Sequence, residues 1–104
     1  VVELNSEQRK NLPLAAVISC NFSNVLYRLS EEVCQKKGIP FDILQPLILE
    51  TAKKIKHTSP SLTQTGPAKR GDFETIEKHL MLLKNDEEKK EIYQLLTASI
   101  KKRQ

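Results

Sequence analysis

Two groups of polar side chains in this sequence have types and spacings that could do chemistry. The first lies in residues 65–80, TGPAKRGDFETIEKHL, where two glycines, two cations and a carboxylate precede an apolar repeat. Free backbone amides at a helix start, with Lys69 and Arg70 just ahead of them, can hold an anion. Asp72 already supplies a negative charge at the cap position, so a capped turn is the simpler interpretation of this spacing. Neither G-x-x-x-x-G-K-[ST] nor G-x-G-x-x-G is present, which argues against a nucleotide loop.

The second group is a polar stripe on the first helix, formed by Asn21, Asn24 and Arg28 at the i, i+3, i+7 spacing. Such a stripe is usually a solvent face. Between residues 14 and 27, however, the helix is apolar on almost every other side, which predicts that it is enclosed. An enclosed asparagine must find hydrogen bonds in the fold, in a partner or in a ligand, so Asn21 and Asn24 are candidate site residues.

The histidines and cysteines form no catalytic or metal-ligating set, and no metal site is expected. His79 lies beside an apolar stripe, where a histidine is usually a hydrogen-bonding residue at the edge of a core. Cys20 and Cys34 fall on one predicted helix and would be roughly 21 Å apart, too far for a disulfide. Both are interpreted as small core or near-core residues in a reducing compartment.

The elements that must position these residues are four main helices. The first runs from about residue 6 to residue 37, with a kink expected near Pro13 and an end at Gly38. A second is predicted over residues 42–57, capped by Asp42. Asp72 caps the third, and Asn85 with Glu88 forms a capping box for the fourth. The predicted apolar faces of the last three helices are Ile43, Leu44, Leu47, Ile48 and Ile55; Phe73, Ile76, Leu80 and Leu83; and Ile92, Leu95, Leu96 and Ile100.

Composition fits one soluble all-α domain. The chain has 104 residues, a net charge of +4 and 38% hydrophobic residues. The cations occur in small scattered groups without interleaved aromatic residues, which argues against nucleic-acid binding. No apolar run has the length of a membrane span and no signal peptide opens the chain, so a cytoplasmic protein without membrane contact is expected. Residues 1–4, VVEL, look like the last strand of a preceding domain, and residues 5–104 like a single helical C-terminal domain of a longer protein.

Three segments together carry a resemblance to a known family: SEQRKNLPLAAVISCNFSNVLY, EEVCQKKGIP and LTQTGPAKRGDFETIEKHL. They resemble the helical C-terminal domain, catalogued as a domain of unknown function, of Rossmann-type NAD(P)-dependent oxidoreductase-like proteins. That family is similar in plan to pyrroline-carboxylate reductase and to 6-phosphogluconate dehydrogenase-like enzymes. The resemblance covers essentially the whole chain, and its most specific part is T-G-P-A-x-R-G-D-x-x-T-[IV]-x-x-H-L. Pro13 departs from the pattern of such relatives.

The resemblance implies a domain that dimerises and closes a substrate cleft, while NAD or NADP is bound mainly by the N-terminal Rossmann domain of the same chain. It also implies that Asn21 and Asn24 face the cofactor domain. Its signature loop would consist of Gly66, Pro67, Arg70, Gly71 and Asp72. The sequence leaves a second hypothesis open, a non-enzymatic helical interaction module whose signature loop only packs the fold.

Overall fold

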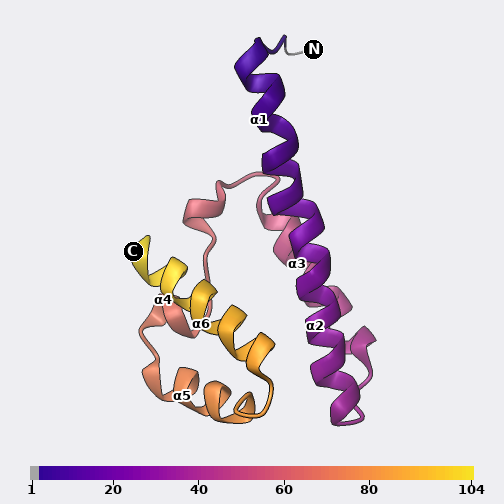
Figure 1. Cartoon of the computed structure of the whole chain (residues 1–104), viewed down its shortest axis with the longest axis vertical. Helices are drawn as coiled ribbons and strands as arrows, with labels where there is room; N and C mark the ends of the chain where they lie inside the picture. The colour runs from indigo at the N-terminus through magenta and orange to yellow at the C-terminus, as the bar shows by residue number, and fades with distance from the viewer. Residues whose placement is uncertain (1–2) are drawn as a thin grey trace. The chain divides into compact units, whose positions relative to one another are not determined.

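The computed structural model describes residues 3–104, and its regular elements are helices and helical turns (Figure 1). No strand is present in that range, which confirms the predicted all-α class. The chain divides into two compact units, Val1–Pro46 and Leu47–Gln104. Of the predicted leading strand, Val1 and Val2 lie outside the described residues, and Glu3 and Leu4 have no regular secondary structure.

One long run of helix dominates the first unit. It consists of α1 (Ser6–Ala16), the π-helical segment η1 (Val17–Asn21) and α2 (Phe22–Lys36). A capping box starts α1, because the Gln8 amide donates to Asn5 Oδ1 at 2.8 Å and the Asn5 amide donates to Gln8 Oε1 at 2.9 Å. Side chains thus satisfy amides that a helix start otherwise leaves unpaired, and the helix begins where the sequence predicted.

The long helix changes its hydrogen-bond pattern one turn after Pro13. Proline has no amide hydrogen and its ring crowds the preceding turn, yet α1 continues to Ala16. In η1 the Phe22 amide donates to the carbonyl of Val17, five residues earlier, as in a π-helix. The predicted interruption of the long first helix is confirmed, but its irregular turn follows Pro13 instead of lying at that residue. The assumed rotation of 100° per residue does not hold across η1.

The glycine cap predicted at the end of the first helix is present. Gly38 has a φ of 67°, in the left-handed region that glycine enters at little cost. The Ile39 amide donates to the Cys34 carbonyl at 2.9 Å and the Gly38 amide to the Gln35 carbonyl at 3.2 Å, which is a Schellman motif. The 3-10 turn η2 (Phe41–Ile43) follows and contacts α2.

The next helix, α3 (Gln45–Lys54), is shorter than the helix predicted over residues 42–57. Asp42 does not cap it, because Asp42 lies inside the turn η2. Pro46 has no amide hydrogen and is tolerated only in the first turn of a helix. An α-helix must therefore start close to Pro46, and α3 begins one residue before it.

Three helices pack together in the second unit: α4 (Pro67–Arg70), α5 (Phe73–Leu82) and α6 (Glu87–Lys102), with the 3-10 turn η3 (Pro60–Leu62) ahead of them. Both α5 and α6 contact α4, which is a single turn long. Of the described hydrophobic residues in this unit, Ala68 and Ile76 alone are buried. The core that positions the signature segment is therefore small.

The cap of α6 is Asp86, so the predicted capping box of Asn85 and Glu88 is wrong by one residue. The Lys89 amide donates to Asp86 Oδ1 at 3.1 Å, and Lys89 Nζ lies 2.8 Å from Asp86 Oδ2. Asp86 thus accepts hydrogen bonds from both the backbone amide and the ammonium group of Lys89. Asn85 has no charge, so its side chain could not form the same ion pair.

Most apolar side chains that were predicted to be buried are exposed in this chain. Every residue from 14 to 27 except Ser23 is exposed, so the prediction that this segment is enclosed is wrong for the described residues. The exposed fractions run from 47% to 58% for Leu12, Leu14, Ile18, Phe22 and Val25. Also exposed, against the prediction, are Ile43, Leu47, Ile55, Phe73, Leu95 and Leu96. The periodicity of the sequence identified which side of each helix is apolar, but it did not indicate whether another part of the chain covers that side.

Candidate functional site

The signature segment starts as a tight entry into α4. Gly66 has φ 103° and ψ 174°, a backbone conformation that essentially only glycine adopts. Pro67 fills the first helical position, where the missing amide hydrogen costs nothing. The Arg70 amide donates to the Gly66 carbonyl at 3.1 Å and closes the turn. The glycine and the proline therefore serve the backbone of this short helix.

Gly71 and Asp72 then join α4 to α5. Gly71 has a φ of 69°, and the Asp72 amide donates to the Pro67 carbonyl at 2.9 Å, as in the Schellman motif after α2. Asp72 next caps α5: the Thr75 amide donates to Oδ1 at 3.2 Å and the Thr75 hydroxyl to Oδ2 at 2.7 Å. The cap predicted at Asp72 is confirmed.

The Asp72 carboxylate is stabilised in its charged form. Its pKa lies below the usual value of 3.8, chiefly because the Thr75 hydroxyl and then the Thr75 amide donate to it, with a smaller effect of Arg70. Arg70 Nη2 is 3.5 Å from Asp72 Oδ2, longer than the usual charge-assisted hydrogen bond, and the Arg70 side chain is 60% exposed. The guanidinium of Arg70 therefore keeps most of its donors available to another anion.

The glycines of the signature do not build a phosphate cradle within this chain. A Cβ added to Gly66 or Gly71 would meet no other atom within 4 Å, so both glycines are required by their φ angles and not by a close approach of the chain. The start of α5, where an anion could bind, already carries the Asp72 carboxylate. The described residues of this segment thus form a helix corner, and Arg70 is its exposed polar group.

Asn21 and Asn24 lie in the first unit, apart in the chain from the signature segment. Asn21 is the last residue of η1 and Asn24 lies in the first turn of α2. Both are exposed, and neither side-chain amide makes a hydrogen bond within residues 3–104. Cys20, predicted as core or near-core, is also exposed, whereas Cys34 is buried and both thiols are free. π-helical turns occur frequently at functional sites, and this one carries a candidate residue.

The partner of His79 could not be recognised from the sequence. His79 Nδ1 is 2.7 Å from the hydroxyl of Tyr93, and the two rings meet edge to face with centroids 5.6 Å apart. His79 is thus the hydrogen-bonding residue at a core edge that was predicted, and its partner is the hydroxyl of Tyr93. Partial burial raises the pKa of Tyr93.

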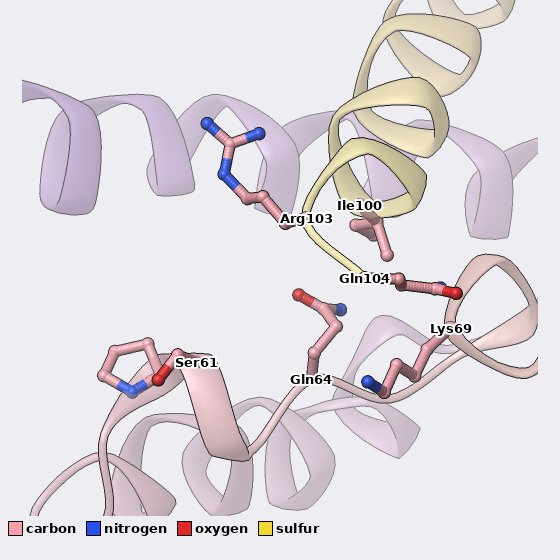
Figure 2. Close-up of a pocket in the computed structure, with 7 residues that line it drawn as sticks. Ser61, Gln64, Lys69, Ile100, Arg103 and Gln104 are labelled. Carbon is pink, nitrogen blue, oxygen red and sulfur yellow. The ribbon is translucent and has the colours of Figure 1, made fainter.

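A pocket that the sequence did not indicate lies between the end of α6 and the segment that leads into α4 (Figure 2). Its volume is about 100 Å³. Polar residues from both segments line it, among them Ser61, Gln64, Lys69 and Arg103. A second pocket of about 220 Å³ shares Pro60 and Gln64 with the first and is otherwise bordered by Lys54, Ile55 and three threonines. No short motif marks the first pocket, because it assembles side chains from residues 60–69 and from residues 100–104.

Residues 3–104 contain neither a cluster of metal-binding side chains nor a helix suited to a membrane. No group of three or more His, Cys, Asp or Glu side chains is placed to hold a metal ion there. None of the helices in that range has both the length and the apolar character needed to cross a bilayer.

Comparisons with known proteins give a family and similar solved structures. Residues 1–100 match the family described as "Domain of unknown function (DUF2520)". The chain is similar to a solved structure described as the crystal structure of "putative NADP oxidoreductase BF3122 from Bacteroides fragilis", with 48% identity and a TM-score of 0.94. That match covers 97% of this chain and 39% of the other, so the chain spans about two fifths of that protein's length. A search of curated proteins found no match. The family resemblance seen in three sequence segments is confirmed.

Proposed function

This chain belongs to the DUF2520 family, and we propose that it is the C-terminal helical domain of an NAD(P)-dependent oxidoreductase of the cytoplasm. In this proposal residues 1–4 end a Rossmann domain and residues 5–104 form the helical domain. The helical domain supplies a dimer interface and one wall of the substrate cleft. The similarity to a protein described as an NADP oxidoreductase, over 97% of this chain, supports the class of enzyme.

The observation that carries the proposal is the exposed apolar surface of the long helix. Five large side chains of α1, η1 and α2, from Leu12 to Val25, are each about half exposed. Soluble proteins rarely leave a contiguous apolar patch of several hundred Å² uncovered unless another surface packs on it. A helix of this length also derives most of its stability from packing of its apolar face. Both facts favour a domain that works against a neighbouring domain and a second subunit.

The cofactor would be bound mainly by the Rossmann domain. A dinucleotide pyrophosphate needs a glycine-rich turn that opens a helix after a strand. The glycines described in this chain are used at helix ends, and Asp72 occupies the start of α5. The residues of this chain therefore do not fit the pyrophosphate, and its contribution is confined to the wall of the cleft.

Within that wall, Asn21 and Asn24 are proposed to orient the nicotinamide or the substrate through their side-chain amides. The amides are exposed and make no hydrogen bond within residues 3–104, so they are available for this role. Arg70 is proposed to bind an anionic group of the substrate, since its guanidinium is exposed and only weakly paired with Asp72.

The test uses the full-length protein. Titration with NADH and NADPH should show binding of one of them, and Asn21→Ala should lower kcat/KM by roughly 3- to 10-fold, the loss of about one hydrogen bond. Asn11→Ala is the matched control, because Asn11 is an exposed asparagine of the same helix run whose side chain donates to the Glu7 carbonyl. An Asn21→Ala enzyme with unchanged kcat and KM would remove the proposed role.

A second candidate function is a non-enzymatic helical interaction module. The same exposed apolar surface favours it, as does the use of the signature glycines for helix ends. Absence of detectable binding of either nicotinamide cofactor to the full-length protein would favour this alternative over the oxidoreductase.

A further inference from the structure

The net charge of the chain resides entirely in its second unit. Val1–Pro46 contains five Lys and Arg and five Asp and Glu, so it is balanced. Leu47–Gln104 contains 12 Lys and Arg against 8 Asp and Glu, which gives the +4 of the whole chain. A ligand that responds to charge would therefore be drawn to the second unit.

The fold gathers much of this charge at one place, where the ends of α4 and α6 meet. The two helices are in contact, and Gln104 Nε2 donates to the Ala68 carbonyl at 2.7 Å. Cations from the last turns of both helices come with them: Lys69, Arg70, Lys101, Lys102 and Arg103. The carboxylate within this segment is Asp72, which is paired with Arg70.

Several of these cations have partners of their own. Lys101 Nζ lies 4.7 Å from the centre of the Phe73 ring, and Arg103 Nη1 donates to the Ser99 carbonyl at 3.0 Å and to its hydroxyl at 2.7 Å. Lys69 and Lys102 make no hydrogen bond or ion pair within residues 3–104, and of these two lysines Lys69 is the one that lines a pocket. Its ammonium group is therefore free to bind a ligand.

Lys69 lines the pocket at the end of α6 together with donors of other types. Figure 2 shows the Lys69 side chain running back toward Gln64, whose amide extends toward the end of α6, with Ser61 to one side. Gln64 Nε2 donates one hydrogen to the Thr65 carbonyl at 3.0 Å and keeps a second one, while Ser61 Oγ lies 3.0 Å from Ser59 Oγ. The apolar wall comes from Pro60 and Ile100, and none of the described residues that line the pocket is acidic. A volume of about 100 Å³ is room for about three water molecules, or for one small oxyanion in their place.

Cations at helix ends also have an ordinary structural purpose, since they offset the partial negative charge of the last carbonyls. That purpose accounts for Arg103, whose guanidinium is held by the Ser99 carbonyl. It does not account for a lysine without a partner that lines a pocket together with the Gln64 amide. Positive charge without a carboxylate to balance it favours a bound anion.

We propose that this pocket binds a small oxyanion, a phosphate or a carboxylate group. Lys69 Nζ and the remaining N–H of the Gln64 amide are its donors, and Arg103 adds positive charge at the rim. The residues that line the pocket include none of Asn21, Asn24 and Arg70, and the proposal holds whether or not the full-length protein is an oxidoreductase.

Calorimetric titration of the full-length protein tests this, with inorganic phosphate and acetate as probes at constant ionic strength. We expect binding with a Kd of about 1 mM. Lys69→Gln should weaken it by about tenfold or more, the effect of one charge-assisted contact. Gln64→Leu, which leaves the charge unchanged, should weaken it less. Lys56→Gln is the charge-matched control, since Lys56 is an exposed lysine of the same unit outside the pocket.

Binding of phosphate alone would identify a phosphate group as the ligand, and binding of both probes would identify oxyanions in general. Failure of both probes to bind, or an equal loss in Lys56→Gln and Lys69→Gln, would overturn the proposal. Circular dichroism of each variant establishes that the fold is intact, so a loss of binding reports on the pocket.

Discussion

Asp72 couples the stability of the second unit to pH. Its pKa in the folded protein lies below the ordinary 3.8, because Thr75 donates two hydrogen bonds to the carboxylate. A lowered pKa stabilises the folded state above pH 3.8, and this stabilisation is lost as the pH falls through the folded-state value. Asp72→Asn should therefore flatten the decline of the melting temperature below pH 3.8, as measured by thermal unfolding across that range.

Glu74→Gln is the control for that series, because Glu74 is an exposed carboxylate on the same helix, paired only with the exposed Lys78. It should leave the decline nearly unchanged. An Asp72→Asn protein whose acid unfolding follows that of the wild type would show that the carboxylate is not the titrating group.

Tyr93 and His79 form a side-chain hydrogen bond that ties α5 to α6. Tyr93→Phe removes the hydroxyl and leaves His79 Nδ1 without its partner, so the free energy of unfolding should fall by about 1 kcal/mol. Urea unfolding measures this. Tyr27→Phe, at an exposed tyrosine without a hydrogen bond in the described residues, should change it by much less; equal effects would contradict the assignment.

Residue roles set by neighbours in the chain could be predicted from the sequence. The caps at Gly38 and Asp72 depend on a few successive residues, and both are present. Asn85 and Asp86 are both good caps, so the sequence did not decide between them. The partner of His79 could not be predicted, because Tyr93 lies 14 residues away on another helix and only packing brings the two rings together.

At the scale of elements, Gly71 allows one chain turn to end α4 and lead directly to the cap of α5. Its φ of 69° places an alanine at that position in the left-handed region, so Gly71→Ala should cost about 1–2 kcal/mol. Gly71→Asn should cost less, because asparagine tolerates this region better. Urea unfolding compares the two variants. Since a new Cβ has open space, the loss would report backbone strain, and an Ala variant as stable as the wild type would refute it.

The ends of the helices could be predicted where a glycine or a proline interrupts the helical hydrogen bonds. Gly38 and Pro46 fixed an end and a start by removing or redirecting hydrogen bonds. The turns η3 and α4 lie between the predicted second and third helices and were missed, since each is a single turn without apolar periodicity. The π-helical segment could not be predicted, because the sequence pattern assumes a constant number of residues per turn.

For the whole molecule, the main consequence is the amount of apolar surface left open on the long helix. If that surface is the proposed dimer interface, Ile18→Asp should shift the full-length protein from dimer to monomer in analytical ultracentrifugation, because a buried unpaired carboxylate is strongly unfavourable at an interface. Leu82→Asp is the matched control at a more exposed apolar residue of the second unit and should leave the assembly unchanged. A wild-type monomer, or an Ile18→Asp dimer, would contradict the proposed interface.

Sequence patterns at this scale identified the fold class and the apolar faces, but not the cover over those faces. Burial depends on surfaces that other parts of a protein or another subunit provide, and helix periodicity cannot tell a core from an interface. The basic pocket was missed for a related reason. Lys69 and Arg103 are 34 residues apart, and the contact between α4 and α6 makes them neighbours of one cavity.

The segment η1 also has a consequence for how this helix can change by insertion or deletion. A π-helical turn accommodates one more residue than an α-helical turn over nearly the same rise. Removing one residue from Val17–Asn21 would therefore leave a continuous α-helix of almost the same length, with α1 and α2 in nearly the same rotational register about the helix axis. A one-residue deletion at η1 would leave Leu12 and Leu14 on the same side of the helix, whereas the same deletion inside α1 or α2 would turn the two parts of the helix by roughly 100° relative to each other.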